Sequence, residues 1–472
     1  MCGICGQIRF DGDTPSSESL DNMMNKLARR GPDSNGKWLE GTIGFGHQRL
    51  SIIDLSSSGS QPMIDSLLKL TLVFNGTIYN YKQLRSRLIG KGYSFFSSSD
   101  TEVIIKAYHY WGEDCVNHLD GMFAFAIWDK PSKKLFIARD RMGIKPLYYN
   151  LTNRAFTFAS NSQALLTQDL DKSVNPIALQ QQLSLHGVVP APNTIINGIK
   201  KLKPGTYIVL SEKGDIKEQT YWHPSATRPE GNVSEEDYIA RTHELLTAAV
   251  TKRMAASDVP IGVLLSGGLD SSLVVALLKE AGHRDIRTFS IGFEDIDDES
   301  GSEFEFSDQV VSKFKTDHKK YLLSNQKVLP RLSEAVMNMS EPMVGQDAIA
   351  FYLLSEQVSK HTKVVLSGQG ADEAFAGYFW YPRMAKEIGS EIERFSKHYV
   401  DRSHKEYLKT VVSQYQGKNH THNWLNKEFS KPGADSFIDK VFRTDMTRLI
   451  VDDPVKRVDN MTMAWGLEAR VP

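Results

Sequence analysis

The sequence has little of what several protein classes require. It contains only three cysteines, too few for a disulfide framework in a chain of this length. No apolar run reaches the roughly 18 residues of a membrane span, and positions 1–9 lack the basic-then-apolar pattern of a secretory signal. A formal net charge of −1 gives no basic footprint for nucleic acid. We therefore expect a cytoplasmic protein with no membrane and no nucleic-acid partner.

What is present is ordinary for a globular protein: 40% hydrophobic and 24% charged residues. A length of 472 residues is enough for roughly two or three domains. The segment 212–235 is polar without an apolar period, and the turn at 200–205 just before it has the composition of a solvated loop. We predict a first domain over 1–211, a linker region over 212–235 and a second domain over 236–472.

The most informative stretch is Ser266–Ser272, with the sequence SGGLDSS. It lies between a strand-like apolar run, 261–265, and a helical pattern, 273–280, and a second strand-like run covers 286–293. A glycine pair at such a strand-to-helix turn predicts a loop that binds phosphates. The lysine of a Walker loop is absent, and Asp270 inside the loop suits a magnesium ion that bridges to the phosphates. A plain glycine–serine turn is the alternative.

A possible nucleophile stands at the start of the chain. Removal of Met1 would give Cys2 a free α-amine. An α-amine titrates near pH 8, so it can take the proton of the thiol in its own residue. A structural cysteine and a redox or metal pair with Cys5 are alternatives, although Cys115 alone does not complete a zinc site.

Polar groups recur at the ends of expected strands in the first domain, where rigid elements can carry a site. The segments concerned are RRGPD at 29–33, GHQRLSIID at 46–54, FNGTIYN at 74–80, SDTE at 99–102 and GMFAFAIWD at 121–129. Helices are expected near 17–27, 81–88, 102–111, 236–254, 348–358 and from 304. Further strands are expected at 121–129, 135–139, near 317–321 and at 363–366.

Together with the SGGLDSS loop, these motifs resemble the glutamine-hydrolysing asparagine synthetases, over essentially the whole chain. The resemblance implies an α/β and α+β protein. Its first domain would be an αββα sandwich of the Ntn-hydrolase type, a class II glutamine amidotransferase. Its second would be a doubly wound parallel-sheet domain with a pyrophosphate loop. The resemblance also implies ATP and Mg²⁺ as cofactors and glutamine, ATP and a carboxylic acid acceptor as substrates, and it is compatible with a homodimer.

The resemblance assigns roles to individual residues. Cys2 would attack the glutamine side-chain amide, with the oxyanion held by Asn75 and Gly76. Arg49 would bind the substrate carboxylate and Asp100 its ammonium group. The implied glutamine-binding set is Arg49, Leu50, Ser51, Ile52, Ile53, Asn75, Gly76, Thr77 and Asp100. The implied ATP-binding set is Leu265, Ser266, Gly267, Gly268, Asp270, Ser271, Ser272, Ile291, Ser367 and Gly368.

Asp270 and Asp372 would share the magnesium ion. For Asp372, the favourable acidic start of a helix is the alternative. One position departs from the family pattern, because Thr77 stands where an acidic residue is usual. Charge-assisted hydrogen bonds contribute about 1.5–3 kcal/mol, so we expect glutamine affinity to be roughly ten- to hundred-fold weaker. The glutamine KM of Thr77→Glu tests this expectation, and an unchanged value would remove it.

Two features bear on the acceptor and on completeness. Gln369 replaces a glutamate of the asparagine synthetases. With 301–308, 340–344 and 377–382, it resembles the branch that amidates N-acetylglutaminylglutamine, so the acceptor is aspartate or this dipeptide. The last residues, 459–472, match a family stretch that normally continues with a lysine-bearing segment. We therefore expect a fragment truncated at its C-terminus, with glutaminase chemistry the better preserved.

Two other functions remain open at this point. One is an ammonia-using, ATP-dependent ligase without glutaminase activity, for which Thr77 is the main support. The other is a non-catalytic fragment that binds glutamine or a nucleotide. A binding module needs no nucleophile, so the intact Cys2 argues against it.

Overall fold

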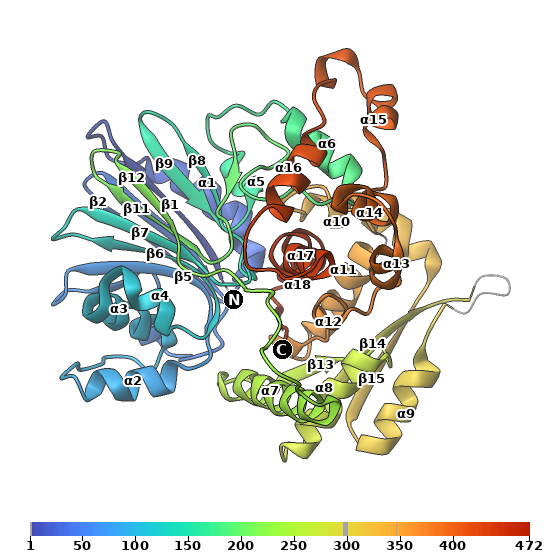
Figure 1. Cartoon of the computed structure of the whole chain (residues 1–472). Helices are drawn as coiled ribbons and strands as arrows, with labels where there is room; N and C mark the ends of the chain where they lie inside the picture. Colours follow the sequence, from blue (N-terminus) through green and yellow to red (C-terminus); the bar gives the residue numbers. More distant parts are fainter. Residues whose placement is uncertain (1, 296–300, 346) are drawn as a thin grey trace.

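A computed structural model describes residues 2–295, 301–345 and 347–472. Figure 1 shows two halves side by side, with the strand-rich first half in blue to green and the second half in green to red. Both chain ends lie near the boundary between the halves. None of the helices in the described ranges is both long enough and apolar enough to cross a membrane.

The first half contains two antiparallel six-stranded sheets that pack face to face. One has the order β10 (Lys200–Lys201), β8 (Tyr148–Leu151), β9 (Ala155–Ala159), β1 (Gly3–Arg9), β3 (Ile43–Arg49) and β2 (Ser34–Glu40). The other has the order β12 (Ile216–Thr220), β11 (Thr206–Ser211), β7 (Lys134–Arg139), β6 (Gly121–Asp129), β5 (Leu70–Ile78) and β4 (Met63–Asp65). Alternating apolar residues such as Ile4, Phe45 and Val73 fill the space between the sheets.

Helices cover both outer faces of this sandwich. Amphipathic α1 (Ser17–Leu27) and the short α5 (Ser162–Leu165) pack on the first sheet. On the second sheet lie α2 (Tyr81–Ile89), α3 (Asp100–Trp111) and α4 (Cys115–His118). The expected αββα sandwich is confirmed. Strand β12 falls inside the predicted linker and pairs with β11, so the first sandwich extends into that region.

The second half is built on a parallel five-stranded sheet. Its order is β15 (Asp317–Leu323), β14 (Arg287–Phe293), β13 (Ile261–Leu264), β16 (Val364–Leu366) and β17 (Glu468–Arg470). One face carries α7 (Glu235–Ala255), α8 (Leu269–Glu280) and α9 (Phe304–Phe314). The opposite face carries α10 (Val328–Met337), α11 (Asp347–Val358) and α18 (Lys456–Met463). The expected doubly wound sheet is confirmed.

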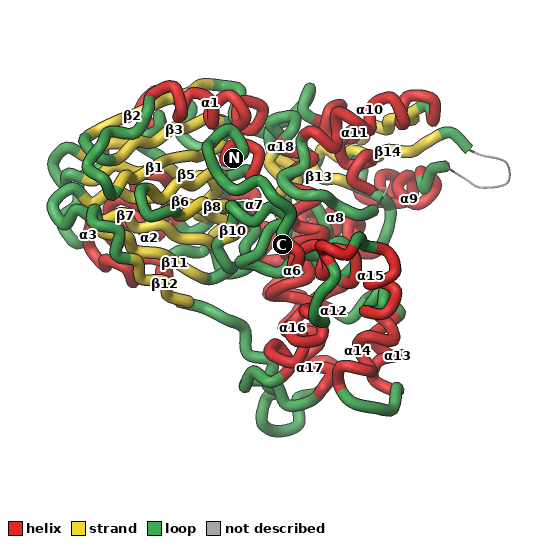
Figure 2. Tube along the Cα trace, turned by 90° about the horizontal axis from the view of Figure 1, so that it is seen from above, coloured by secondary structure: helices red, strands yellow, loops and turns green. Residues whose placement is uncertain are grey.

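A separate group of helices, at the lower right of Figure 2, lies beside this sheet. It consists of α6 (Pro176–Ser184), α12 (Ala371–Phe375), α13 (Trp380–Lys386), α14 (Glu391–Tyr399), α15 (His404–Thr410), α16 (His420–Phe429) and α17 (Phe437–Thr444). Aromatic side chains such as Tyr381, Phe395 and Phe429 form much of its core. Two π-helical turns, Asp445–Leu449 and Val451–Val455, lead from it into α18.

Buried ion pairs join the two halves. Arg30 of the first half pairs with Asp459 of the second at 2.8 Å, and both side chains are at most 6% exposed. Lys201 pairs with Glu341 at 2.9 Å and with Asp452 at 2.6 Å. The expectation of a solvated turn at 200–205 is therefore wrong for Lys201, because its charge is buried and compensated by partners distant in sequence. Breaking one such buried pair typically costs 3–5 kcal/mol, so these contacts hold the halves in a fixed arrangement.

Candidate active sites

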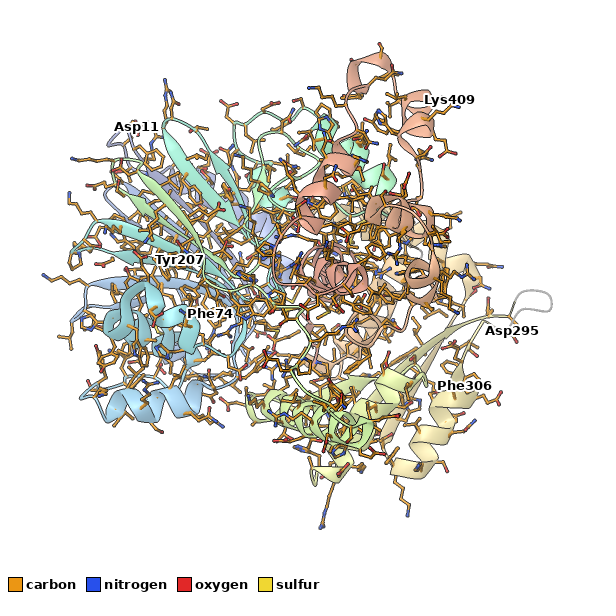
Figure 3. All side chains as sticks on the ribbon, in the orientation of Figure 1. Asp11, Phe74, Tyr207, Asp295, Phe306 and Lys409 are labelled. Atoms are coloured by element: carbon orange, nitrogen blue, oxygen red, sulfur yellow. The ribbon has the colours of Figure 1, made fainter. Side chains whose placement is uncertain are left out.

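A narrow cavity in the first half gathers most of the predicted glutamine-binding residues. It is lined by Cys2, Arg49, Leu50, Ile52, Ile53, Gly59, Gln61, Phe74, Gly76, Thr77, Ser99, Asp100 and Thr101. Phe74, labelled in Figure 3, lies in the first half near its boundary with the second. Ser51 does not line the cavity, and its backbone N–H donates to Asp33 at 2.7 Å. Asn75 lies fully buried beside the cavity.

Cys2 directly precedes β1, and hydrogen bonds to its N–H and carbonyl groups fix its backbone. Its N–H donates to Asn75 Oδ1 at 3.0 Å, and Arg30 Nε donates to its carbonyl oxygen at 3.3 Å. Burial raises the pKa of the Cys2 thiol. The thiol is therefore protonated near neutral pH and needs a base before it can act as a nucleophile. Met1, whose removal is expected from the sequence, lies outside the described residues.

The neighbouring strand β5 presents two N–H groups suited to an oxyanion. The Nδ2 amide of Asn75 is buried and has no hydrogen-bond partner among the described residues. Gly76 has a φ of +153°, and a Cβ at this position would lie 2.1 Å from the carbonyl oxygen of Met122. Only glycine fits there. A buried unpaired donor is costly unless a ligand completes it, and this is the arrangement that an oxyanion hole requires.

Charges of opposite sign face this cavity from different elements. The Arg49 guanidinium, at the end of β3, is held by the carbonyl oxygens of Asp54 and of Ser56, the latter at 3.0 Å. Asp100, at the start of α3, accepts the N–H of Ile78 at 3.0 Å. Burial raises the pKa of Asp100 to about 6. A fixed cation and a carboxylate across one small space complement the two charged groups of an α-amino acid.

Thr77 directs its hydroxyl group toward the second half. The hydroxyl donates to Glu468 Oε1 at 3.1 Å, and Arg470 Nη2 donates to Thr77 Oγ1 at 3.4 Å. Glu468 and Arg470 belong to β17 and are fully buried. Their place near the glutamine cavity could not be predicted from the sequence, because no local signal links positions 391 residues apart.

A larger cavity, of about 260 Å³, lies at the carboxyl ends of β13, β14 and β16. Open parallel sheets bind their ligands at this edge. Of the predicted nucleotide and metal residues, those that line it are Leu265, Ser266, Gly268, Asp270, Ser271, Ile291, Ser367, Gly368 and Asp372. Gly267 and Ser272 do not. Gly267 has a φ of +93°, and a Cβ there would lie 2.5 Å from the backbone nitrogen of Ser307, so the turn requires glycine.

The loop between β13 and α8 has the geometry of an anion cradle. Gly268 caps α8 without a side-chain hydrogen bond to the first turn, so no side chain occupies the start of this helix. The Ser266 and Ser271 hydroxyl groups are 3.0 Å apart, and Ser266 Oγ also accepts the N–H of Gly268 at 3.2 Å. Free N–H groups and the positive end of the helix dipole favour a phosphate at this edge.

Two carboxylates share one side of the larger cavity. Burial raises the pKa of Asp270, and the nearby charge of Asp372 raises it further. The two carboxylates therefore lie close enough to repel each other, and a cation between them would relieve that repulsion. Across 2–295, 301–345 and 347–472, no group of three or more His, Cys, Asp or Glu side chains is arranged to hold a metal ion.

Some lining residues were not expected from the sequence. Phe351 and Leu354 of α11 give the larger cavity an apolar wall. Their helix was predicted, but its pattern does not say which side faces a ligand. Glu373 also lines the larger cavity and accepts the Tyr378 hydroxyl at 2.8 Å. Gln369 and Tyr378, which the sequence already linked to the acceptor, line the same cavity. In the smaller cavity, Gln61 gave no sequence signal; its Oε1 accepts the N–H of Phe74 at 2.6 Å.

A buried cysteine beside two possible oxyanion donors in one half, with a loop suited to phosphates in the other half, defines a two-site amidotransferase. Residues 1–222 match the model of the glutamine amidotransferase domain, and residues 241–472 match the asparagine synthase model. "Asparagine synthetase [glutamine-hydrolyzing] 1" of Bacillus subtilis is 33% identical, covering 100% of this chain and 79% of its own length. "Putative asparagine synthetase [glutamine-hydrolyzing] 2" of Methanocaldococcus jannaschii is 34% identical, covering 83% of this chain and 81% of its own length.

The chain belongs to the family of glutamine-hydrolysing asparagine synthetases, which are glutamine-dependent, ATP-using amidotransferases. Among solved structures, a glutamine phosphoribosylpyrophosphate amidotransferase from B. subtilis aligns with a TM-score of 0.36 and 16% identity, over 61% of this chain and 75% of that one. A likeness of that size carries no weight for function. The predicted domain bounds and the expected truncation stay predictions.

Proposed function

We propose that this chain transfers the amide nitrogen of glutamine to a carboxylic acid, with cleavage of ATP to AMP and pyrophosphate. The observation that carries the proposal is the presence of two cavities in one rigid arrangement. One surrounds Cys2 in the first half, and the other contains the Ser266–Ser272 loop in the second half. Buried ion pairs hold the two halves together. Each cavity supplies the groups that one half of this reaction needs. Membership of the asparagine synthetase family supports the same reaction.

In the first cavity, the Cys2 thiolate attacks the side-chain amide carbon of glutamine. Asn75 Nδ2–H and the backbone N–H of Gly76 stabilise the oxyanion that forms. Ammonia leaves, a thioester remains on Cys2, and water releases it as glutamate. Arg49 and Asp100 hold the α-carboxylate and the α-ammonium group of the substrate, so its amide lies beside the sulfur atom.

In the second cavity, the N–H and hydroxyl groups of Ser266–Ser272 bind the phosphates of ATP. Asp270 and Asp372 would hold a magnesium ion, which would supply positive charge to offset the negative charge of the phosphates. Two carboxylates suit this ion, because magnesium in nucleotide sites takes its other ligands from water and phosphates. The acceptor carboxylate attacks the α-phosphorus atom and pyrophosphate leaves. Ammonia then attacks the acyl carbon and displaces AMP.

The acceptor is proposed as aspartate or the carboxyl group of N-acetylglutaminylglutamine. Gln369, which lines the larger cavity, supports the second. A carboxylate at this position would pair with the free ammonium group of aspartate, whereas an N-acetylated acceptor carries no such group. A cytoplasmic location and a homodimer remain predictions from the sequence.

The test is glutamate release from glutamine, with and without ATP, by the wild type and by Cys2→Ala. We expect release by the wild type only, and AMP formation with one of the two acceptors. Cys2→Ala should still form the amide when ammonia is supplied. No release from folded protein that begins at Cys2 would overturn the glutaminase and leave an ammonia-using ligase.

A further inference from the structure

The glutamine cavity has a contact that originates outside its own half. The hydroxyl group of Thr77 donates to Glu468 Oε1 at 3.1 Å, and both residues are at most 1% exposed. Thr77 belongs to β5 of the sandwich, whereas Glu468 belongs to β17, an edge strand of the parallel sheet. A hydrogen bond to a buried carboxylate is among the strong ones, and neither partner has water to replace the other.

Thr77 lies next to the groups that handle the oxyanion. Side chains alternate along a strand, so Asn75 and Thr77 project from the same face of β5, with Gly76 between them. Asn75 on that face accepts the Cys2 N–H at 3.0 Å. The three residues are also fixed from β6, because Gly76 leaves no room between itself and Met122. A displacement of Thr77 therefore moves the Gly76 N–H and the Asn75 amide as well.

Glu468 is held firmly on its own side. Arg470 Nε donates to Glu468 Oε1 at 2.5 Å, and Arg470 Nη2 donates to the carbonyl oxygen of Ala256 at 3.0 Å. Burial alone would raise the pKa of Glu468, but nearby positive charges, Arg470 and Lys145 among them, lower it to about 2. Glu468 is therefore a carboxylate near neutral pH and can accept the Thr77 hydroxyl there.

The strand that carries Glu468 also touches the nucleotide cavity. The carbonyl oxygen of Arg470 accepts the backbone N–H of Ser367 at 2.9 Å. Ser367 lines the larger cavity at the end of β16, the strand that pairs with β17. Two of the three residues of β17 thus contact lining residues of the two cavities: the side chains of Glu468 and Arg470 contact Thr77, and the Arg470 backbone contacts Ser367.

We propose that Glu468 is a positioning residue of the glutaminase, which fixes the Asn75–Thr77 segment through its hydrogen bond with Thr77. The proposal rests on the proposed function of this cavity. The glutaminase site is then incomplete without β17 of the second half. Because the oxyanion exists only during the reaction, a loosened segment lowers kcat and leaves the glutamine KM nearly unchanged.

The test compares glutamate release by Glu468→Gln and Thr77→Val with the wild type. Misplaced catalytic groups cost up to about a hundredfold, and we expect kcat to fall about ten- to hundredfold in each variant with KM within about twofold. Thr77→Val keeps the shape of the side chain, so it tests the hydrogen bond even if Glu468→Gln folds poorly. Thr77→Ser restores the hydroxyl and is expected to recover most of the lost kcat.

The double variant separates positioning from independent damage. If the two residues act through one hydrogen bond, the double variant is no worse than the more damaged single variant. Glu341→Gln is the matched control: Glu341 is an equally buried carboxylate at the same boundary, bonded to Lys201 and away from the glutamine cavity. Its kcat should stay near that of the wild type.

Three outcomes would overturn the proposal: a wild-type kcat in Thr77→Val, multiplicative losses in the double variant, or an equal loss in Glu341→Gln. A loss confined to KM would do the same. A wild type that releases no glutamate would instead overturn the proposed function. The two failures are therefore distinguishable.

Discussion

The two cavities differ in how complete they are without a ligand. The glutamine cavity, about 30 Å³, has charged groups already fixed by buried hydrogen bonds, as with Arg49 and Asp100. The nucleotide cavity, about 260 Å³, contains two carboxylates that repel each other and an uncapped helix start. The first site is preorganised for one small substrate, whereas the second is finished by the charges that its ligands bring.

This difference indicates which changes should inactivate each site. A fixed site fails when one of its rigid donors is removed, because nothing else moves to replace it. A site completed by ligands fails when the balance between its own charges and theirs is changed. The two kinds of damage should also be separable, since glutamate release and ammonia-dependent amide formation report on different cavities.

The largest expected effect is the loss of one rigid donor. Asn75→Ala removes the buried Nδ2 and the acceptor of the Cys2 N–H. We expect the kcat of glutamate release to fall about 10²–10³-fold, with ammonia-dependent amide formation unchanged. Asn150→Ala, which removes an amide bonded to Gly198 elsewhere in the sandwich, is the control. An unaltered kcat in Asn75→Ala would show that this amide is not an oxyanion donor.

A change of charge in the nucleotide cavity should impair amide formation and leave glutamate release intact. Asp372→Asn removes one of the two carboxylates proposed to hold magnesium. Each 1.36 kcal/mol of lost transition-state stabilisation is a factor of ten, and we expect amide formation to fall about a hundredfold. Glutamate release should be unchanged. Asp308→Asn, an acid outside the cavity, is the control; equal losses in both variants would contradict the assignment.

The glutamine cavity should also show a defined pH limit. Asp100 has a pKa of about 6, raised by burial, so it is a carboxylate above that pH and neutral below it. Only the carboxylate pairs with the substrate ammonium group. The glutamine KM should therefore rise roughly tenfold per pH unit below about 6. Asp100→Asn should have a high KM that does not change between pH 5 and 7.5, and a wild-type KM that stays flat there would disprove the pairing.

The smallest effect is expected from an exposed contact between the halves. Lys363 pairs with Asp33 at 2.7 Å, and the two side chains are 39% and 27% exposed. Lys363→Ala should lower the free energy of unfolding by at most about 1 kcal/mol, measured in urea at low salt, and by less at high salt. Both activities should persist. A loss above about 2 kcal/mol would mean that solvent does not screen this pair as its exposure implies.

Much of the frame follows from local patterns. The helix predicted at 17–27 and the strand at 121–129 occupy those bounds in the structure. The strand–turn–helix unit around Ser266–Ser272 could be predicted because the glycines, the apolar run and the helical period all indicate it within one short segment. Most predicted residues of each site also meet at one cavity, although their roles stay predictions.

What escaped prediction depends on distant partners. Lys201 was predicted to be solvated because no residue near it in the sequence compensates its charge. Its partners lie 140 and 251 residues away. Glu468 and Thr77 meet across 391 residues for the same reason. The helices α13–α17 received no prediction, since a core of aromatic residues shared among several short helices leaves little period in any one of them.

The buried ion pairs at the boundary also constrain how this family can be recombined. A chimera with a crossover between the two matched domains would take Lys201 from one parent and Glu341 with Asp452 from the other. Unless both parents use the same arrangement of charges, the hybrid buries an uncompensated ion. Substitutions at these positions should therefore accumulate together over evolution, and lineages that diverged here would no longer exchange halves.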